Sequence, residues 1–375
     1  MGCGCSRKRS NSIQLLTGDD LSASTDKTAL RRCTCRKTVA RSALVLLLSL
    51  LGAFMVVWVV IPVSFMLSLP FQTFMVFVPI DSPRNADFDR PESFGLEGVR
   101  NFHISTRDYY QNDTWTSIGA WMLLPEDEIS SSASSNVTEI LQNTQKDILV
   151  YLHGVLANRA KALEQYRVLR RHFLVVAIDH RGYGDSGRNV RMGEEGMAHD
   201  HVQIFQWIKS INPQRDVYYW GHSMGSGISA RTLKLLNQQH SISPTGLILE
   251  SPFTSLEDVV STMVLGRMFS WLAYFEAAIL RPLATNGFHF RSKENIQSID
   301  CPVMILHAED DMIVSFSLGE ALAQVAQDTR EPHQGPVLFQ GISADYGFGH
   351  NDIVHHPEID DFIQNFQAIC QNFTH

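Results

Sequence analysis

Short apolar runs alternate with helix-length segments through most of the chain. Six runs rich in aliphatic, β-branched and aromatic residues predict buried β-strands. They are Ile148–Leu152, Phe173–Ile178, Val217–Trp220, Gly246–Leu249, Val303–Leu306 and Val337–Gln340. Segments such as Met197–Ile211 and Gly225–Asn237 separate most of them. Apolar strands that alternate with helices favour a mostly parallel sheet with helices on both faces, so we expect one α/β domain over residues 91–375.

One segment near the N-terminus is apolar without alternation. No charged residue occurs over residues 42–80, and 42–61 has the length needed to cross a hydrocarbon core of roughly 30 Å. We expect a single transmembrane helix over 42–61. Pro62 and Pro70 then interrupt the pattern, which predicts an interfacial segment and linker over 62–90. A second crossing, which would return the body to the cytosol, is the alternative.

The distribution of charge orients this span. Residues 1–41 carry nine Lys or Arg and three Asp, a net charge of +6, in a chain whose net charge is −8. The positive-inside bias therefore predicts a cytosolic basic tail over 1–41 and a body on the other side of the membrane. A basic arm before an acidic body indicates a membrane surface rather than a nucleic-acid partner.

Candidate modification sites bear on the same question. Three N-x-Ser/Thr sequons, at Asn112, Asn136 and Asn372, all follow the span, which favours a lumenal, glycosylated body.

The six cysteines are divided by the span. The opening residues fit a myristoylation pattern on Gly2, with Cys3 and Cys5 as candidate palmitoylation sites; a solvated basic tail is the alternative. Only Cys301 and Cys370 follow the span, so the fold is not built on disulfides. The sequence leaves open whether these two cysteines pair.

The strand Val217–Trp220 runs directly into the motif Gly-His-Ser-Met-Gly, and a helix-length segment follows. A G-x-S-x-G motif between a strand and a helix holds a serine on a tight, strained turn. The glycines Gly221 and Gly225 remove Cβ atoms that would clash in that turn. We predict Ser223 as an exposed nucleophile.

A nucleophilic serine needs a base and an acid that orients the base, on loops after later strands. Asp310 and Asp311 follow the strand Val303–Leu306, and Val314, three residues further on, favours Asp311 as the acid. The glycine-bearing loop after the last strand ends in His350, which we predict as the base.

Two further sets of residues complete this prediction. His355 and His356 adjoin the last helix, and we expect them to belong to its cap. The strand Ile148–Leu152 ends in His-Gly, so the backbone N–H groups of Val155 and Met224 are the candidates for an oxyanion hole.

One motif is rejected as a dinucleotide site. Residues 182–187 read G-x-G-x-x-G, but Asp179, His180 and Arg181 separate them from the preceding strand and no helix follows at once. We expect a structural turn, with no cofactor. The metal-binding spacing H-E-x-x-H is also absent, and no metal site is predicted.

Five motifs together support a family resemblance. They are Leu152–Gly154, Asp179–Ser186, Gly221–Gly225, Leu249–Thr254 and Leu306–Asp311. With them the chain resembles the membrane-bound α/β-hydrolase-domain lipases, the group that acts on lysophosphatidylserine and monoacylglycerol. The resemblance implies an α/β-hydrolase fold, a catalytic triad of Ser223, Asp311 and His350, and an endoplasmic reticulum membrane protein with a lumenal active site.

The sequence departs from that family at two places. Val155-Leu156-Ala157 stands where many relatives have Asn-Ala-Gly, which bears on the acyl pocket. The acylation pattern at the N-terminus is also not expected of such a lipase.

The predicted activity is hydrolysis of fatty-acyl esters of single-chain lipids through an acyl-enzyme. The expected partners are the lipid substrate and the membrane, with no protein partner predicted. Residues 255–283, rich in Met and aromatic residues, form either a cap over an acyl-chain path or a core helix. The alternatives are a membrane-associated protein depalmitoylase, which shares the chemistry, and a non-catalytic interaction protein on the same fold.

Overall fold

The computed structural model describes residues 18–130, 132 and 135–373, with side chains from residue 37 onward except at 264 and 265. Gly2, Cys3 and Cys5 lie outside the described residues. The chain divides into two compact units, Met1–Val63 and Ser64–His375.

The apolar helix is longer than the sequence predicts. Helix α1 (Gly18–Met55) continues through a π-helical turn, η1 (Val56–Val60), into α2 (Ile61–Leu67). Within the described residues, Lys37–Leu67 is the one helix whose length and composition suit a membrane crossing, with a mean hydropathy of 2.9 over its most apolar window.

The expected break at Pro62 does not occur. The π-helical turn precedes this proline and already interrupts the regular hydrogen-bond ladder, so the missing proline N–H is accommodated. The break comes instead at Ser68, whose hydroxyl accepts a hydrogen bond from the N–H of Phe71 (3.3 Å) and caps helix α3 (Leu69–Phe77). Pro70 lies in the first turn of α3, where no N–H is needed. Residues 62–67 are therefore helical.

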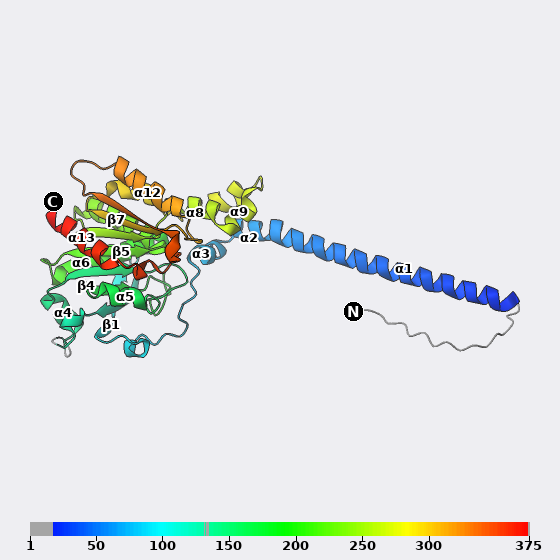
Figure 1. Cartoon of the computed structure of the whole chain (residues 1–375), viewed down its shortest axis with the longest axis horizontal. Helices are drawn as coiled ribbons and strands as arrows, with labels where there is room; N and C mark the ends of the chain where they lie inside the picture. Colours follow the sequence, from blue (N-terminus) through cyan, green and yellow to red (C-terminus); the bar gives the residue numbers. More distant parts are fainter. Residues whose placement is uncertain (1–17, 131, 133–134, 374–375) are drawn as a thin grey trace. The chain divides into compact units, whose positions relative to one another are not determined.

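An eight-stranded sheet forms the core of the second unit, with the strand order β1-β2-β4-β3-β5-β6-β7-β8 (Figure 1). The strands are β1 (Val99–Arg107), β2 (Trp115–Leu123), β3 (Asp147–Leu152), β4 (Phe173–Ile178), β5 (Val217–His222), β6 (Gly246–Glu250), β7 (Val303–Ala308) and β8 (Val337–Ile342). Strand β2 pairs antiparallel with β1 and β4, and β3 to β8 are mutually parallel. All six predicted strands are confirmed. Strands β1 and β2 carry polar residues among the apolar ones, so the pattern of apolar runs does not predict them.

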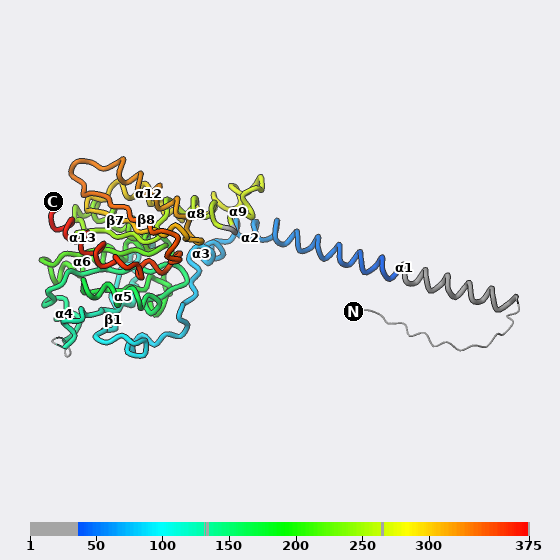
Figure 2. Tube along the Cα trace, viewed as in Figure 1, coloured from blue at the N-terminus to red at the C-terminus, as the bar shows by residue number. Residues whose placement is uncertain are grey.

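Helices cover both faces of this sheet, and the same arrangement can be followed along the Cα trace in Figure 2. The helices are α4 (Val137–Asn143), α5 (Leu163–Leu169), α6 (Glu194–Ile211), α7 (Met224–Leu235), α8 (Leu256–Thr262), α9 (Val264–Ser270), α10 (Arg281–Thr285), α11 (Ser292–Asn295), α12 (Phe316–Asp328) and α13 (Ile359–Asn372). One apolar core contains residues of α6, α7 and α12, and a second contains residues of α5 and α13. These layers, one on each face, are those of an α/β-hydrolase fold.

A fully buried arginine joins three separate parts of this domain. The Arg181 guanidinium, in the turn after β4, donates hydrogen bonds to both carboxylate oxygens of Asp200 on α6 (2.7 and 2.8 Å) and to Asp108 after β1. Both carboxylates are also almost completely buried. A buried charge of this kind is tolerated because opposite charges and hydrogen bonds surround it.

We predict that Arg181→Leu destabilises the domain by about 3–5 kcal/mol, because it leaves two buried carboxylates without their counter-charge. The thermal unfolding midpoint of the full chain in detergent measures this loss. Arg188→Leu, which removes a largely exposed arginine paired with Asp81, is the control and should change the midpoint little. Equal effects of the two substitutions would contradict the prediction.

Candidate active site

Ser223 lies on a turn that only a special backbone conformation permits. It connects β5 to α7 with φ of +52° and ψ of −118°, outside the regions that a serine ordinarily adopts. Its N–H donates a hydrogen bond to the carbonyl of Glu250 at the end of β6 (2.9 Å). A Cβ atom at Gly225 would overlap the carbonyl oxygen of Leu152, and one at Gly221 would overlap that of Gly225. The glycines of the motif are therefore required by close backbone packing.

Asp311 and His350 meet at the carboxyl ends of β7 and β8. The Nδ1–H of His350 donates to Oδ2 of Asp311 at 2.7 Å, and both side chains are buried. The other oxygen of Asp311 accepts the N–H groups of Ile313 (2.8 Å) and Val314 (2.9 Å). The spacing to Val314 that favours Asp311 in the sequence thus corresponds to a turn closed by this carboxylate.

Asp310 has a different position. Its carboxylate accepts the N–H of Gly349 (3.0 and 3.1 Å), the residue before His350. The two neighbouring aspartates therefore hold the same loop, one through its backbone and the other through the imidazole.

The surroundings set the charge of this pair. Burial alone would raise the pKa of Asp311, but hydrogen bonds from His307 and His350 hold it far below its ordinary value, so the carboxylate is ionised. Burial lowers the pKa of His350 below 6.5, against an opposing contribution from Asp311. An imidazole that is neutral at neutral pH, with Nδ1 carrying the proton, leaves Nε2 able to accept one.

Two residues that the sequence analysis did not assign hold His350 against the Ser223 turn. The Nε2–H of His222 donates to the carbonyl of His350 (2.9 Å), and the hydroxyl of Ser251 donates to the same oxygen (3.3 Å). Among the described residues, neither the Ser223 hydroxyl nor Nε2 of His350 has a hydrogen-bond partner. Two sequence signals could have indicated these residues: His222 lies within the G-x-S-x-G motif, and Ser251 directly follows β6.

The loop after β3 passes close to the serine. A Cβ at Gly154 would lie 3.0 Å from the Cβ of Ser223. In the part of the chain that the structure describes, the backbone N–H groups of Val155 and Met224 donate no hydrogen bond to another residue. Behind them, the Nδ1–H of His153 donates to the carbonyl of Gly154 (2.7 Å), and burial lowers the pKa of His153 to about 4. Two N–H donors beside a serine can stabilise an oxyanion.

The remaining candidate residues lie elsewhere. Asn112, Asn136 and Asn372 are exposed, and the Asn136 side chain also caps α4. Cys301 and Cys370 are buried and are both free thiols. His356 accepts the N–H of Glu358 (3.2 Å) beside the start of α13, as expected of a cap.

The glycine-rich segment 182–187 forms a turn, with α6 beginning only at Glu194, so it is no dinucleotide site. Over the described residues, no group of three His, Cys, Asp or Glu is arranged to hold a metal ion.

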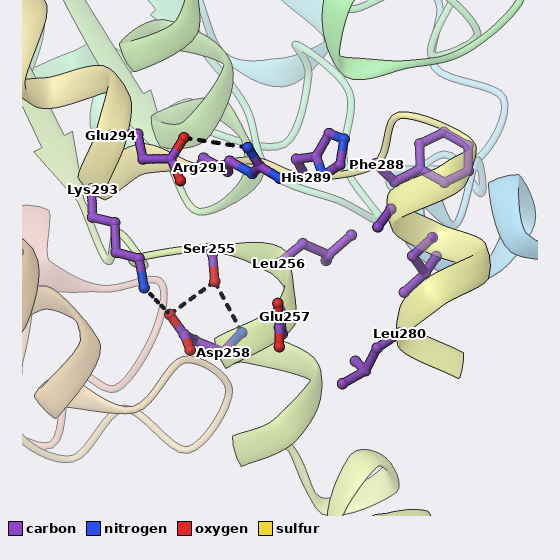
Figure 3. A pocket seen from close by; sticks show the side chains of 12 residues that line it. Ser255, Leu256, Glu257, Asp258, Leu280, Phe288, His289, Arg291, Lys293 and Glu294 are labelled. Atoms are coloured by element: carbon purple, nitrogen blue, oxygen red, sulfur yellow. Dashed lines mark hydrogen bonds and ion pairs between the residues drawn. The ribbon is translucent and has the colours of Figure 1, made fainter. Parts of the chain in front are cut away.

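A polar pocket of about 330 Å³ is separate from this site (Figure 3). Residues 255–258, at the start of α8, line one side, and residues around α10 and α11 line the other. Lys293 pairs with Asp258 (3.6 Å), and Arg291 pairs with Glu294 (3.4 Å). Four of its charged groups therefore pair with one another.

Comparison with known proteins shows the family of this chain. Residues 143–287 match the family described as serine aminopeptidase S33. The lysophosphatidylserine lipase ABHD12 of Xenopus tropicalis is 30% identical over 315 residues, which cover 82% of this chain and 79% of the relative. The Gallus gallus lysophosphatidylserine lipase ABHD12 is 31% identical, with 85% and 83% covered.

The chain belongs to the ABHD12 lysophosphatidylserine lipase family. This membership confirms an α/β-hydrolase and a carboxylic ester hydrolase, so the alternative of a non-catalytic interaction protein is wrong. An esterase of Pyrococcus furiosus, at 15% identity, has the same fold, with a TM-score of 0.52 over 75% of this chain and 93% of its own. The single long apolar helix fits a membrane-anchored member of the ABHD12 family.

We predict that the rate of ester hydrolysis falls as the pH drops through a pKa below 6.5, because the burial of His350 favours its neutral, proton-accepting form. The profile of kcat/KM against pH for a short-chain ester measures this pKa. A midpoint above 6.5 would contradict the lowered pKa of His350.

Asp311→Asn should lower kcat by about 10⁴, because it removes the group that keeps the proton on Nδ1. The pKa of the remaining activity should fall further, since Asp311 raises the pKa of His350. Asp310→Asn is the matched control: its side chain still has an oxygen to accept the N–H of Gly349, so the pH profile should be retained. A larger loss of kcat in Asp310→Asn than in Asp311→Asn would assign the role of catalytic acid to Asp310 instead.

Proposed function

We propose that this chain is a membrane-anchored lipase that hydrolyses the acyl ester of lysophospholipids such as lysophosphatidylserine, and of monoacylglycerol. The observation that carries the proposal is the buried Asp311–His350 hydrogen bond beside the strained Ser223 turn. The substrate class follows from the relatives, which are named lysophosphatidylserine lipases. An anchor favours a single-chain amphiphile, which reaches a site beside the bilayer without crossing water.

In the proposed mechanism, the Ser223 oxygen attacks the acyl carbonyl while Nε2 of His350 takes the hydroxyl proton. The N–H groups of Val155 and Met224 stabilise the oxyanion, and Asp311 stabilises the imidazolium. Collapse of the tetrahedral intermediate breaks the ester bond, and His350 returns its proton to the departing glycerol oxygen. Water, deprotonated by His350, then attacks the acyl-enzyme and releases the fatty acid and Ser223.

We further propose that the enzyme resides in the endoplasmic reticulum membrane, with residues 1–41 cytosolic and the catalytic domain lumenal. The basic tail before the span and the exposure of all three sequon asparagines support this orientation. A protein depalmitoylase would use the same chemistry on the cytosolic side, so the side of the membrane on which the domain lies separates the two functions.

Ser223→Ala should abolish covalent labelling by a fluorophosphonate and lower the rate of lysophosphatidylserine hydrolysis by about 10⁴ or more. Lipid profiling of cells that express the variant or the wild type should show higher lysophospholipids and monoacylglycerols in the variant. Ser210→Ala, on the exposed end of α6, is the control and should retain both labelling and activity. If the fluorophosphonate labels Ser223 but these lipids do not change, the lipase function is rejected, while the chain remains a serine hydrolase of another substrate.

Enzymatic removal of N-glycans should shift the electrophoretic mobility of the protein from cells, because a lumenal domain exposes its sequons to glycosylation. The sequons are best removed as Asn112→Gln, Thr138→Ala and Asn372→Gln. Thr138→Ala spares the Asn136 side chain, whose loss as the cap of α4 would cost about 1 kcal/mol. A protein without glycans would instead support the cytosolic depalmitoylase.

A further inference from the structure

The chain leaves the bilayer close to the active site. The apolar helix ends at Leu67, and only Ser68 separates it from α3. Nine residues of helix span about 14 Å. At the far end of α3 the carbonyl of Phe77 accepts a hydrogen bond from the hydroxyl of Tyr183, which also contacts the sulfur of Met224 (3.8 Å). Since Met224 follows Ser223, one short helix connects the end of the apolar span to the turn that carries the nucleophile.

Helix α3 also contacts the segment that directly follows the cap, which we define as residues 255–283, between β6 and β7. The amide of Asn286, just after α10, donates to Gln72 on α3 (2.7 Å), and the ring of Phe288 packs against Phe77 with 5.5 Å between centroids. Figure 1 shows α3, α8 and α9 at the same end of the catalytic domain. The cap therefore lies at the end of the domain from which the anchor emerges.

Large apolar side chains are exposed on this end. We call them the apolar face: Met263 (37% exposed), Met268 (43%), Trp271 (67%) and Tyr274 (38%) of the cap, with Phe74 (46%) and Met75 (43%) of α3. These exposed fractions do not fit the alternative of a buried core helix over residues 255–283. Monomeric soluble proteins seldom leave such a cluster in water.

The charge pattern of the cap indicates what covers this face. Residues 259–275 contain a single charged residue, the exposed Arg267, and no acid. Tryptophan, tyrosine and a cation beside apolar side chains are typical of segments that lie in the interface of a bilayer. A protein partner would not explain why the exposed apolar side chains of α3 directly follow the apolar span. A bilayer explains this, because the proposed membrane-spanning helix ends at Leu67, two residues before α3 begins.

We infer that the apolar face inserts into the bilayer interface, so that a single-chain lipid passes from the membrane into the site under the cap. This inference extends the proposed function, because it assigns the route by which the substrate arrives. Trp271 enters the acyl-chain region, and Arg267 remains at the level of the phosphates.

The test uses the full chain in vesicles whose phosphatidylcholine carries brominated acyl chains, which quench nearby tryptophans. The difference between the wild type and Trp271→Phe isolates the Trp271 signal from that of Trp58 in the span. We expect this difference to be strongly quenched. Ile242→Trp is the control: Ile242 is 40% exposed just before β6, at the opposite edge of the parallel strands, and a tryptophan there should not be quenched. An unquenched Trp271 would overturn the inference, whatever the enzyme hydrolyses.

A second measurement tests the route. Trp271→Asp should lower hydrolysis of lysophosphatidylserine in vesicles by about tenfold or more, because a carboxylate is not accommodated among acyl chains. Hydrolysis of a monodisperse short-chain ester should be unchanged, and so should both activities in Ile242→Asp. Equal loss on both substrates would contradict entry from the membrane. Ser223→Ala tests the proposed function separately. It should abolish hydrolysis of every substrate and leave the quenching of Trp271 unchanged.

Discussion

The backbone of Ser223 is the constraint on which the site depends. A serine with φ of +52° exists only because strand β5, helix α7 and the end of β3 approach so closely that Gly221 and Gly225 cannot carry side chains. The same approach brings Gly154 against the serine and leaves the N–H groups beside it without acceptors. The strain at Ser223 and the two unpaired N–H groups beside it are thus consequences of one packing arrangement. The same arrangement leaves Ser223 only 7% exposed, so the expectation of an exposed nucleophile is wrong.

The proposed base, His350, is held by contacts from several strands. His222, at the end of β5, and Ser251, directly after β6, donate hydrogen bonds to the carbonyl of His350. Asp311, after β7, accepts the Nδ1–H of its ring. Parallel strands end at one edge of the sheet, so loops far apart in sequence meet there. The imidazole is fixed through its backbone as well as through its ring, as a base must be before the substrate arrives.

One short helix, α3, joins the apolar span to the proposed active site. Helix α3 begins one residue after the apolar span and ends at Phe77, whose carbonyl is bonded to Tyr183 next to Met224. A lipid hydrolase needs its serine within reach of the bilayer, because its substrates have little solubility in water. The short α3 connection meets that need without a flexible linker, and helices α8 and α9 of the cap lie at the same end of the domain as α3 (Figure 1).

The sequence alone determined the parallel core of the sheet and the position of Ser223, because apolar runs and a G-x-S-x-G motif are local patterns. The preference for Asp311 over Asp310 was local too, since Val314 closes a turn on the Asp311 carboxylate. Only the tertiary structure revealed β1 and β2, whose polar residues are accommodated by an edge hairpin. It alone decided that the helix continues past Pro62, that His222 and Ser251 hold His350, and that Cys301 and Cys370 are both free thiols. The helix continues because a π-helical turn directly precedes Pro62. The other features depend on contacts between residues distant in the chain, and no local pattern encodes such contacts.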